Sequence, residues 1–318
     1  MNKYIKLNRI EFVVTDSCNG RCKHCSVGVR DGVSSVIDSE KAVQVIEHLS
    51  SVFSIESIMT FGGEPLIYPE IVTRIHKKAK DKNIAKRQLI TNGYFSKDEK
   101  RIHQVADEIY QSGVNNIIIS VDAFHQEYIP FEPVIMFAGI LFEIDTSCVR
   151  ISPAWIDSKE SKNIYNDETT RLLRRFTDKG IPVDDGNIIF PAGNALVNLK
   201  EYFPEPCENI LDLSCGDLPY TGRLDDVTSL SIDPDGNVKI CSITIGNIYE
   251  TDISEIVTRY NPEKDPLLSL ILKEGIKGLK QYAITLEISV DLSEVYSACQ
   301  ACGIIIAAIK EYICSREI

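Results

Sequence analysis

Three closely spaced cysteines near the start of the chain carry the strongest chemical signal in the sequence. Cys18, Cys22 and Cys25 have the spacing C-x3-C-x2-C and follow an apolar stretch at residues 10–14. A cubane iron–sulfur cluster normally takes four thiolates, so a loop that supplies three leaves one iron open to another molecule. Structural zinc sites use C-x2-C or C-x4-C pairs that close a four-ligand shell. The triplet therefore predicts a catalytic [4Fe–4S] site. The alternatives are a zinc site with a distant fourth ligand, a chance spacing and, more weakly, disulfides.

Three further motifs follow the triplet in order, each at the end of a strand-like run. They are Phe61-Gly62-Gly63-Glu64-Pro65, Thr91-Asn92-Gly93 and Ile119-Ser120-Val121-Asp122. Together with the triplet, they resemble the GGEP, TNG and S-x-D segments of the radical S-adenosylmethionine (radical SAM) superfamily. The resemblance implies that the open iron of the [4Fe–4S] cluster binds S-adenosylmethionine (SAM). Reductive cleavage of SAM would then give a 5′-deoxyadenosyl radical that abstracts a hydrogen atom from the substrate.

The resemblance also places SAM-binding residues on the first two of these motifs and on the triplet. Glu64 would bind the methionyl ammonium, and Gly62 and Gly63 would let the backbone approach SAM closely because they have no side chain. Asn92 lies at the mouth formed by the strand ends. His24 stands beside the third cysteine, at a usually aromatic position where backbone atoms face the adenine. For Glu64 the alternative is a structural role.

Three residues further along the chain complete the predicted SAM site. Ser120 and Asp122 would bond the ribose hydroxyls or the methionyl end, although the short S-x-D match also fits a structural role. Arg150 is a candidate bidentate partner for the methionyl carboxylate. Alternation along its strand leaves open that Arg150 points outward instead.

The first two-thirds of the chain alternates strand-like and helix-like segments and predicts an α/β fold. The strands are expected at residues 10–15, 57–61, 88–91, 116–121, 149–156 and within 181–190, and the helices at 40–52, 69–80, 98–112, within 133–143 and at 169–179. Six such units match the partial, open (β/α)6 TIM-like barrel that the resemblance implies. Because the active sites of parallel barrels lie at the carboxyl ends of the strands, we expect the motifs to meet around one cavity.

The last third carries a second set of cysteines, namely Cys215, Cys241, Cys299 and Cys302. Residues 231–241 predict a β-hairpin with the turn Pro-Asp-Gly-Asn. This segment and the closing C-x2-C resemble the SPASM and twitch domains, which carry auxiliary iron–sulfur clusters. The resemblance implies a barrel at residues 1–200 and a small auxiliary [4Fe–4S] domain at 201–318. Because the spacing before the hairpin is long, Cys207 or Cys314 in place of Cys215, an open ligand position and a zinc site remain alternatives.

The leftover cysteines are Cys148, Cys207 and Cys314. Cys148 precedes the fifth strand and is expected to be a buried structural thiol. Cys314 lies late in the terminal helix, as a core residue or an alternative ligand. Cys207 lies where the chain crosses from the barrel to the auxiliary domain, and a thiol there could donate a hydrogen atom to a substrate radical, as an epimerase needs. We therefore treat Cys207 as a candidate catalytic residue.

Composition excludes several classes of protein. The chain has 318 residues, 44% of them hydrophobic, and a formal net charge of −12, which disfavours binding to a nucleic-acid backbone. It shows no signal peptide, and its longest late apolar run, residues 303–309, is far shorter than the ~20 residues of a membrane helix. Ten cysteines without an export signal indicate reduced or metal-bound thiols. We expect a soluble cytoplasmic protein without membrane or nucleic-acid partners.

Three functions fit these features. The first is modification of a ribosomally made peptide by epimerisation, crosslinking or thioether formation. The second is a small-molecule dehydrogenase or other biosynthetic enzyme whose auxiliary cluster accepts electrons. The third is a non-catalytic iron–sulfur protein, but such a protein would have no need of the motifs that serve SAM. Either enzyme would need an electron donor of the flavodoxin or ferredoxin type.

Overall fold

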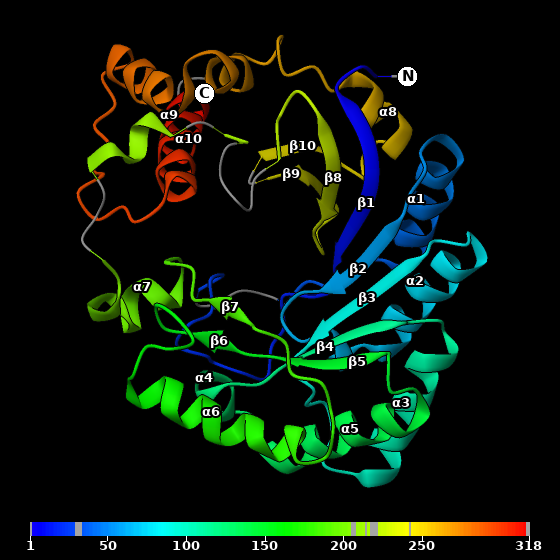
Figure 1. Cartoon of the computed structure of the whole chain (residues 1–318). Coiled ribbons are helices and arrows are strands. Elements are labelled where there is room, and N and C mark those ends of the chain that lie inside the picture. Colours follow the sequence, from blue (N-terminus) through cyan, green and yellow to red (C-terminus); the bar gives the residue numbers. More distant parts are fainter. Residues whose placement is uncertain are drawn as a thin grey trace.

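The computed structural model describes residues 2–28, 34–204, 208–213, 215–216, 222–241 and 243–315. Its centre is an eight-stranded sheet in the order β10-β9-β8-β1-β2-β3-β4-β5. The strands of the predicted barrel are β1 (Ile5–Val13), β2 (Ser57–Phe61), β3 (Lys86–Thr91), β4 (Asn116–Ser120) and β5 (Val149–Ser152). All of these neighbours pair in parallel. The strands form an open arc, so the predicted α/β partial barrel is confirmed (Figure 1).

Five amphipathic helices lie along the outer side of this arc (Figure 1). They are α1 (Ser39–Val52), α2 (Pro69–Asp81), α3 (Glu99–Gln111), α5 (Phe131–Ile144) and α6 (Ile164–Thr177). Asp38 caps α1, because its side chain accepts hydrogen bonds from two backbone N–H groups of the first turn. The apolar face of each helix packs against the strands, and fully buried residues such as Phe12 and Phe137 form the core. Within the described ranges, no helix has the length and apolar character needed to cross a membrane.

The predicted fifth and sixth strands are each divided into two parts. Pro153 separates β5 from β6 (Ala154–Trp155), since proline cannot donate to a ladder of hydrogen bonds. The sixth strand first bridges β5 at Val183 and then forms β7 (Asn187–Ile188), which pairs in parallel with β6. The short helices α4 (Ala123–Gln126) and α7 (Asn194–Asn198) follow β4 and β7. Both short helices lie near the cysteine loop.

The last third of the chain continues the main sheet. β8 (Val227–Ile232) pairs in parallel with β1 and forms the predicted hairpin with β9 (Asn237–Ile240), and β10 (Ile243–Asn247) extends it. Gly236 occupies the hairpin turn at φ +82°, where an added Cβ would lie 2.6 Å from the Tyr249 ring. Three helices complete this part, namely α8 (Ile253–Arg259), α9 (Pro266–Thr285) and α10 (Ala298–Cys314). The domain boundary at residue 200 stays a prediction.

Candidate active site

The cysteine loop follows β1 and is hydrogen-bonded to the chain that leaves β2. The Gly63 N–H donates to the Thr15 carbonyl oxygen at 2.8 Å, and the Glu64 N–H donates to the Ser17 carbonyl oxygen at 2.8 Å. Gly62 has φ +145°, and an added Cβ would lie 2.6 Å from the Thr15 oxygen. The first glycine of the motif is therefore required for the close approach of the two segments. Whether these glycines also contact SAM stays a prediction.

Glu64 joins the ends of β2 and β3. Its fully buried carboxylate accepts hydrogen bonds from the Thr91 hydroxyl (2.6 Å) and from the backbone N–H groups of Leu66 (2.8 Å) and Asn92 (2.7 Å). Burial raises the pKa of Glu64 to about 7, and these hydrogen bonds oppose a further rise. All three hydrogen-bond donors come from the protein, so Glu64 has a clear structural role. Its predicted contact with the SAM ammonium stays a prediction.

Asn92 connects β3 to the cysteine loop. Its side-chain amide donates to the Asn19 oxygen at 2.8 Å and accepts from the Tyr94 N–H at 2.9 Å. The amide of Asn19, which lies next to Cys18, donates to the Tyr94 carbonyl oxygen. The predicted SAM-site position of Asn92 therefore lies directly against the loop that carries the cysteines.

The carboxylate of Asp122 is buried at the carboxyl end of β4 and accepts four hydrogen bonds. One oxygen accepts from the N–H groups of Phe124 (3.0 Å) and His125 (2.9 Å), and the other from His125 Nδ1 (2.8 Å) and the Ala154 N–H (3.1 Å). Burial favours a higher pKa, but the nearby His125 and His24 hold the pKa of Asp122 below its ordinary value. Because both oxygens are engaged, the predicted ribose contact would require Asp122 to give up a protein partner.

Ser120 and Arg150 differ in the hydrogen bonds that their side chains make. Ser120 ends β4, and its hydroxyl has no hydrogen-bond partner among the described residues, so it remains available to a ligand. Arg150 donates from Nε to Asp184 at 2.9 Å and from Nη1 to Asn116 at 2.8 Å. Asn116 begins β4, so the guanidinium is directed toward the amino ends of the strands. The predicted contact between Arg150 and the methionyl carboxylate would require these bonds to break.

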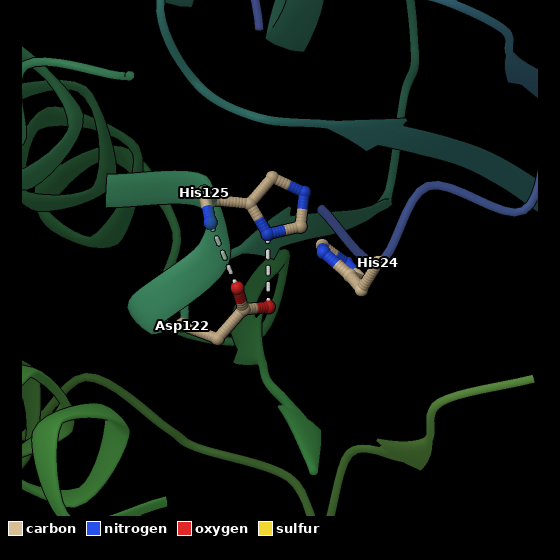
Figure 2. Close-up of side chains that lie close together, drawn as sticks. All are labelled: His24, Asp122 and His125. Atoms are coloured by element: carbon tan, nitrogen blue, oxygen red, sulfur yellow. Dashed lines mark hydrogen bonds and ion pairs between the residues drawn. The ribbon is translucent and has the colours of Figure 1, made fainter. Parts of the chain in front are cut away.

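The ring of His24 packs against α4 and lies beside Asp122 and His125 (Figure 2). Its centroid lies 5.0 Å from that of Phe124 and 4.7 Å from that of His125, and its buried Nδ1 has no hydrogen-bond partner among the residues that the structure describes. Burial lowers the pKa of His24 to about 4, although Asp122 opposes this shift. Ligand atoms of the three residues in Figure 2 lie within 4.8 Å of one another, close enough to hold a metal ion. The four hydrogen bonds on Asp122 favour a hydrogen-bond network instead.

Asn194 also positions the cysteine loop, although it belongs to none of the motifs recognised in the sequence. Its N–H donates to the Cys25 carbonyl oxygen at 2.8 Å, and its side-chain amide donates to the Cys22 carbonyl oxygen at 3.2 Å. The preceding Gly193 has φ +55°, and an added Cβ would lie 2.5 Å from the Ser26 oxygen. The one sequence feature that could have indicated this role is the Gly-Asn pair shortly after the sixth strand. The loop is thus held by the chain after β2, after β3 and after β7.

We expect Asn194→Ala to weaken iron binding at the cysteine triplet. The substitution removes the side-chain hydrogen bond to the Cys22 carbonyl, so the loop samples geometries that cannot hold the cluster. Loss of one such bond corresponds to roughly a fivefold faster release of iron to a chelator. Asn198→Ala is the matched control, because within the described ranges the amide of Asn198 bonds only the Asn194 carbonyl, at an exposed position of α7. Equal release rates in the two variants would contradict the assigned role.

The three thiols of the triplet lie close enough to influence one another. Cys22 is buried, Cys25 is partly buried and Cys18 is exposed. Burial raises the pKa of Cys22 well above its ordinary value, and Asp122, Cys18 and Cys25 raise it further. A cationic iron centre would reverse this effect, since metal coordination deprotonates thiols. The site therefore fits a group that brings positive charge to three thiolates.

The cysteines of the last third also converge on one cavity. It is lined by Cys215, Cys241, Cys299 and Cys302 and by apolar side chains that include Leu224, Ile243, Ile271 and Ile306. Burial raises the pKa of Cys302 to about 12, and the other three thiols add to this shift. Four thiols around one apolar cavity are compatible with the predicted iron–sulfur cluster and with the zinc alternative.

The other cysteines lie away from this cavity or outside the described residues. Cys148 is buried, and its thiol donates to the Leu141 carbonyl oxygen at 3.7 Å, as expected for a structural thiol. Cys314 ends α10, is exposed and does not line the cavity. Cys207, the candidate hydrogen-atom donor, lies outside the described residues, so its role stays a prediction.

Curated proteins that match part of this chain include GTP 3′,8-cyclases. GTP 3′,8-cyclase of Desulforamulus reducens is 28% identical over 124 residues, which are 38% of this chain and 36% of that protein. Probable GTP 3′,8-cyclase of Methanocaldococcus jannaschii is 25% identical over 122 residues, 38% of this chain and 39% of that protein. The matched region thus spans well under half of these relatives.

Solved structures and a family model match more of the chain. Streptococcus suis SuiB bound to S-adenosylmethionine has a TM-score of 0.57 at 16% identity, covering 84% of this chain and 68% of that one. Native anSMEcpe with bound AdoMet has a TM-score of 0.50 at 13% identity, covering 97% of both chains. These likenesses show a shared fold. The family model of the radical SAM superfamily matches residues 12–194, more than half of the sequence. This chain therefore belongs to the radical SAM superfamily and is an enzyme that binds SAM and a [4Fe–4S] cluster.

Proposed function

We propose that this radical SAM enzyme modifies a ribosomally made peptide by epimerisation, crosslinking or thioether formation. The supporting observation is the exposed edge of β7. The N–H groups of Asn187 and Ile189 donate to the carbonyl oxygens of Pro153 and Trp155. The intervening N–H of Ile188 therefore points to the opposite side, where no described residue accepts from it. Ile188 and Phe190 are 49% and 40% exposed. An extended peptide can pair with such an edge and bury these side chains.

This edge leads directly to the cysteine loop. Gly193 follows Ile188 by five residues, and its Cα would lie 3.6 Å from a Cβ added at Gly28. The next residue, Asn194, donates its N–H to the Cys25 carbonyl oxygen. The apolar side chains of Val27 and Val197, 63% and 82% exposed, flank this junction. A peptide strand on β7 would therefore continue over an apolar rim toward the triplet. SuiB, which shares the fold with a TM-score of 0.54 in this form, has been solved bound to its precursor peptide SuiA.

We also infer an auxiliary [4Fe–4S] cluster held by Cys215, Cys241, Cys299 and Cys302. The convergence of these thiols on one apolar cavity supports this assignment. When bound, the triplet cluster supplies the electron that cleaves SAM, and the auxiliary cluster supplies a second redox centre. The chain fixes the cysteine loop from three sides and buries Cys22 and Glu64 away from water. A flavodoxin- or ferredoxin-type protein is the electron donor that this chemistry requires.

Anaerobic turnover with short peptides encoded beside the gene tests the proposal. We expect 5′-deoxyadenosine to form together with a mass change in one such peptide. Ile188→Pro should reduce peptide modification about tenfold, because proline removes the outward N–H of the β7 edge. Ile188→Ala is the matched control, since it keeps that N–H. SAM cleavage without peptide should be equal in both variants, and equal peptide turnover in both would contradict β7 pairing.

A small-molecule reaction is the second candidate. The curated relatives are named as GTP 3′,8-cyclases, and that reaction has a nucleotide substrate. A small-molecule dehydrogenase or other biosynthetic enzyme would use the auxiliary cluster as an electron acceptor. In that case a small metabolite, and no peptide, would stimulate 5′-deoxyadenosine formation. Ile188→Pro would then leave that stimulated rate unchanged.

A further inference from the structure

We propose that His125 binds the methionyl carboxylate of SAM through its Nε2 atom. His125 lies in α4, directly after the carboxyl end of β4, where the predicted SAM-site residues gather. Its ring stands edge-on to His24, which lies between the second and third cysteines of the triplet (Figure 2). The imidazole therefore lies beside the cysteine loop.

Asp122 fixes the orientation of this imidazole. His125 Nδ1 donates to the Asp122 carboxylate at 2.8 Å, and that carboxylate is anchored by three backbone N–H groups (Figure 2). The Nε2 atom then has no hydrogen-bond partner among the described residues, and it is not among the buried unpartnered atoms. The side chain is 17% exposed. Nε2 is therefore accessible to a ligand, whereas both oxygens of Asp122 are engaged.

The charges around His125 match the methionyl end of SAM, which carries one ammonium and one carboxylate. Burial disfavours the charged imidazole, but the Asp122 and Glu64 carboxylates raise the pKa of His125 above its ordinary value. Glu64 belongs to the motif after β2, and His125 follows β4. An ammonium on the Glu64 side and a carboxylate on the His125 side would each meet the opposite charge.

The other cation predicted for this carboxylate already has protein partners. Arg150 is held by Asp184 and Asn116, and its guanidinium is directed toward the amino ends of the strands. His125 instead lies at the carboxyl end, beside the cysteine loop. The geometry thus favours His125 over Arg150 as the donor to the carboxylate.

Binding of SAM and of decarboxylated SAM to anaerobically reconstituted, oxidised protein tests the proposal. His125→Asn keeps a donor near Nδ1 for Asp122 but removes the group at Nε2. We expect the dissociation constant for SAM to rise about tenfold or more, as for loss of one charge-assisted hydrogen bond. The dissociation constant for decarboxylated SAM should change less than about twofold. The preference of the protein for SAM over its decarboxylated analogue should therefore fall about tenfold.

Equal weakening of both ligands, or no change in either, would overturn the proposal. Iron content and thermal stability, measured on each variant, separate a folding defect from loss of the contact. His125→Gln is the second variant, because its amide reaches the position of Nε2 without the positive charge. Because this amide is a neutral donor, we expect the preference of the Gln variant for SAM to fall by only about a third of that tenfold change on a logarithmic scale. If the Asn variant keeps the wild-type preference for SAM, the proposed role of His125 is rejected. If the Asn variant does not take up iron, the same result in the Gln variant rejects it.

Discussion

Cys22→Ala is expected to remove one four-iron cluster and to reduce SAM cleavage to background. The wild-type chain should take up about eight irons on anaerobic reconstitution, because two cubane clusters hold four each. Cys22 is the buried member of the triplet, so its loss leaves two thiolates for a cluster that already lacks one protein ligand. The variant should keep about four irons in the C-terminal cavity. Iron content and 5′-deoxyadenosine formation are the two measurements.

The reciprocal variant is Cys299→Ala, which removes a thiol of the second cavity. It should also approach four irons, yet retain SAM cleavage because the triplet is intact. Cys148→Ala is the matched control, since Cys148 is a buried thiol that lines neither site. It should bind about eight irons. Four irons in the wild-type chain would reject the auxiliary cluster, and SAM cleavage in Cys22→Ala would reject the assignment of the triplet.

Local sequence pattern predicted most of the elements. The run Asn116–Ser120 is rich in isoleucine and forms a buried parallel strand, and the helix expected at residues 40–52 spans Ser39–Val52. The turn at Gly236 was also predicted, because few other residues tolerate that backbone conformation. The pairing of β8 with β1 was not predicted, since it joins segments more than two hundred residues apart. No local signal specifies such a contact.

The motifs identified candidate site residues but did not reveal their partners. The S-x-D motif put Asp122 at a strand end, yet its four hydrogen bonds depend on the immediate turn into α4 and on Ala154. Alternation along β5 could not show that Asp184 would lie opposite Arg150. Spacing therefore predicts which residues gather at the site, whereas tertiary contacts determine which of their atoms remain available.

Glu64→Ala is expected to destabilise the protein strongly even before any cofactor binds. The buried carboxylate accepts three hydrogen bonds, two from backbone N–H groups and one from Thr91. Its removal leaves these donors unpaired in the interior, at a cost of about 3 kcal/mol or more in the free energy of unfolding. Glu64→Gln keeps the shape and one acceptor oxygen, so it should cost about 1–2 kcal/mol. Urea unfolding of the cluster-free, reduced protein measures both values.

The pH dependence of Glu64→Gln tests the same site independently. The pKa of Glu64 is about 7 in the folded protein, against an ordinary value of 4.5. Between these values the folded state binds more protons than the unfolded state, so the contribution of Glu64 to stability falls as pH rises from 4.5 to 7. The full change is on the order of 3 kcal/mol for a shift of this size. Glutamine does not titrate, so wild-type stability relative to Glu64→Gln should be highest near pH 4.5 and should decline toward pH 7. A difference that stays constant across this range would contradict the raised pKa and would show that the three hydrogen bonds offset the effect of burial on Glu64.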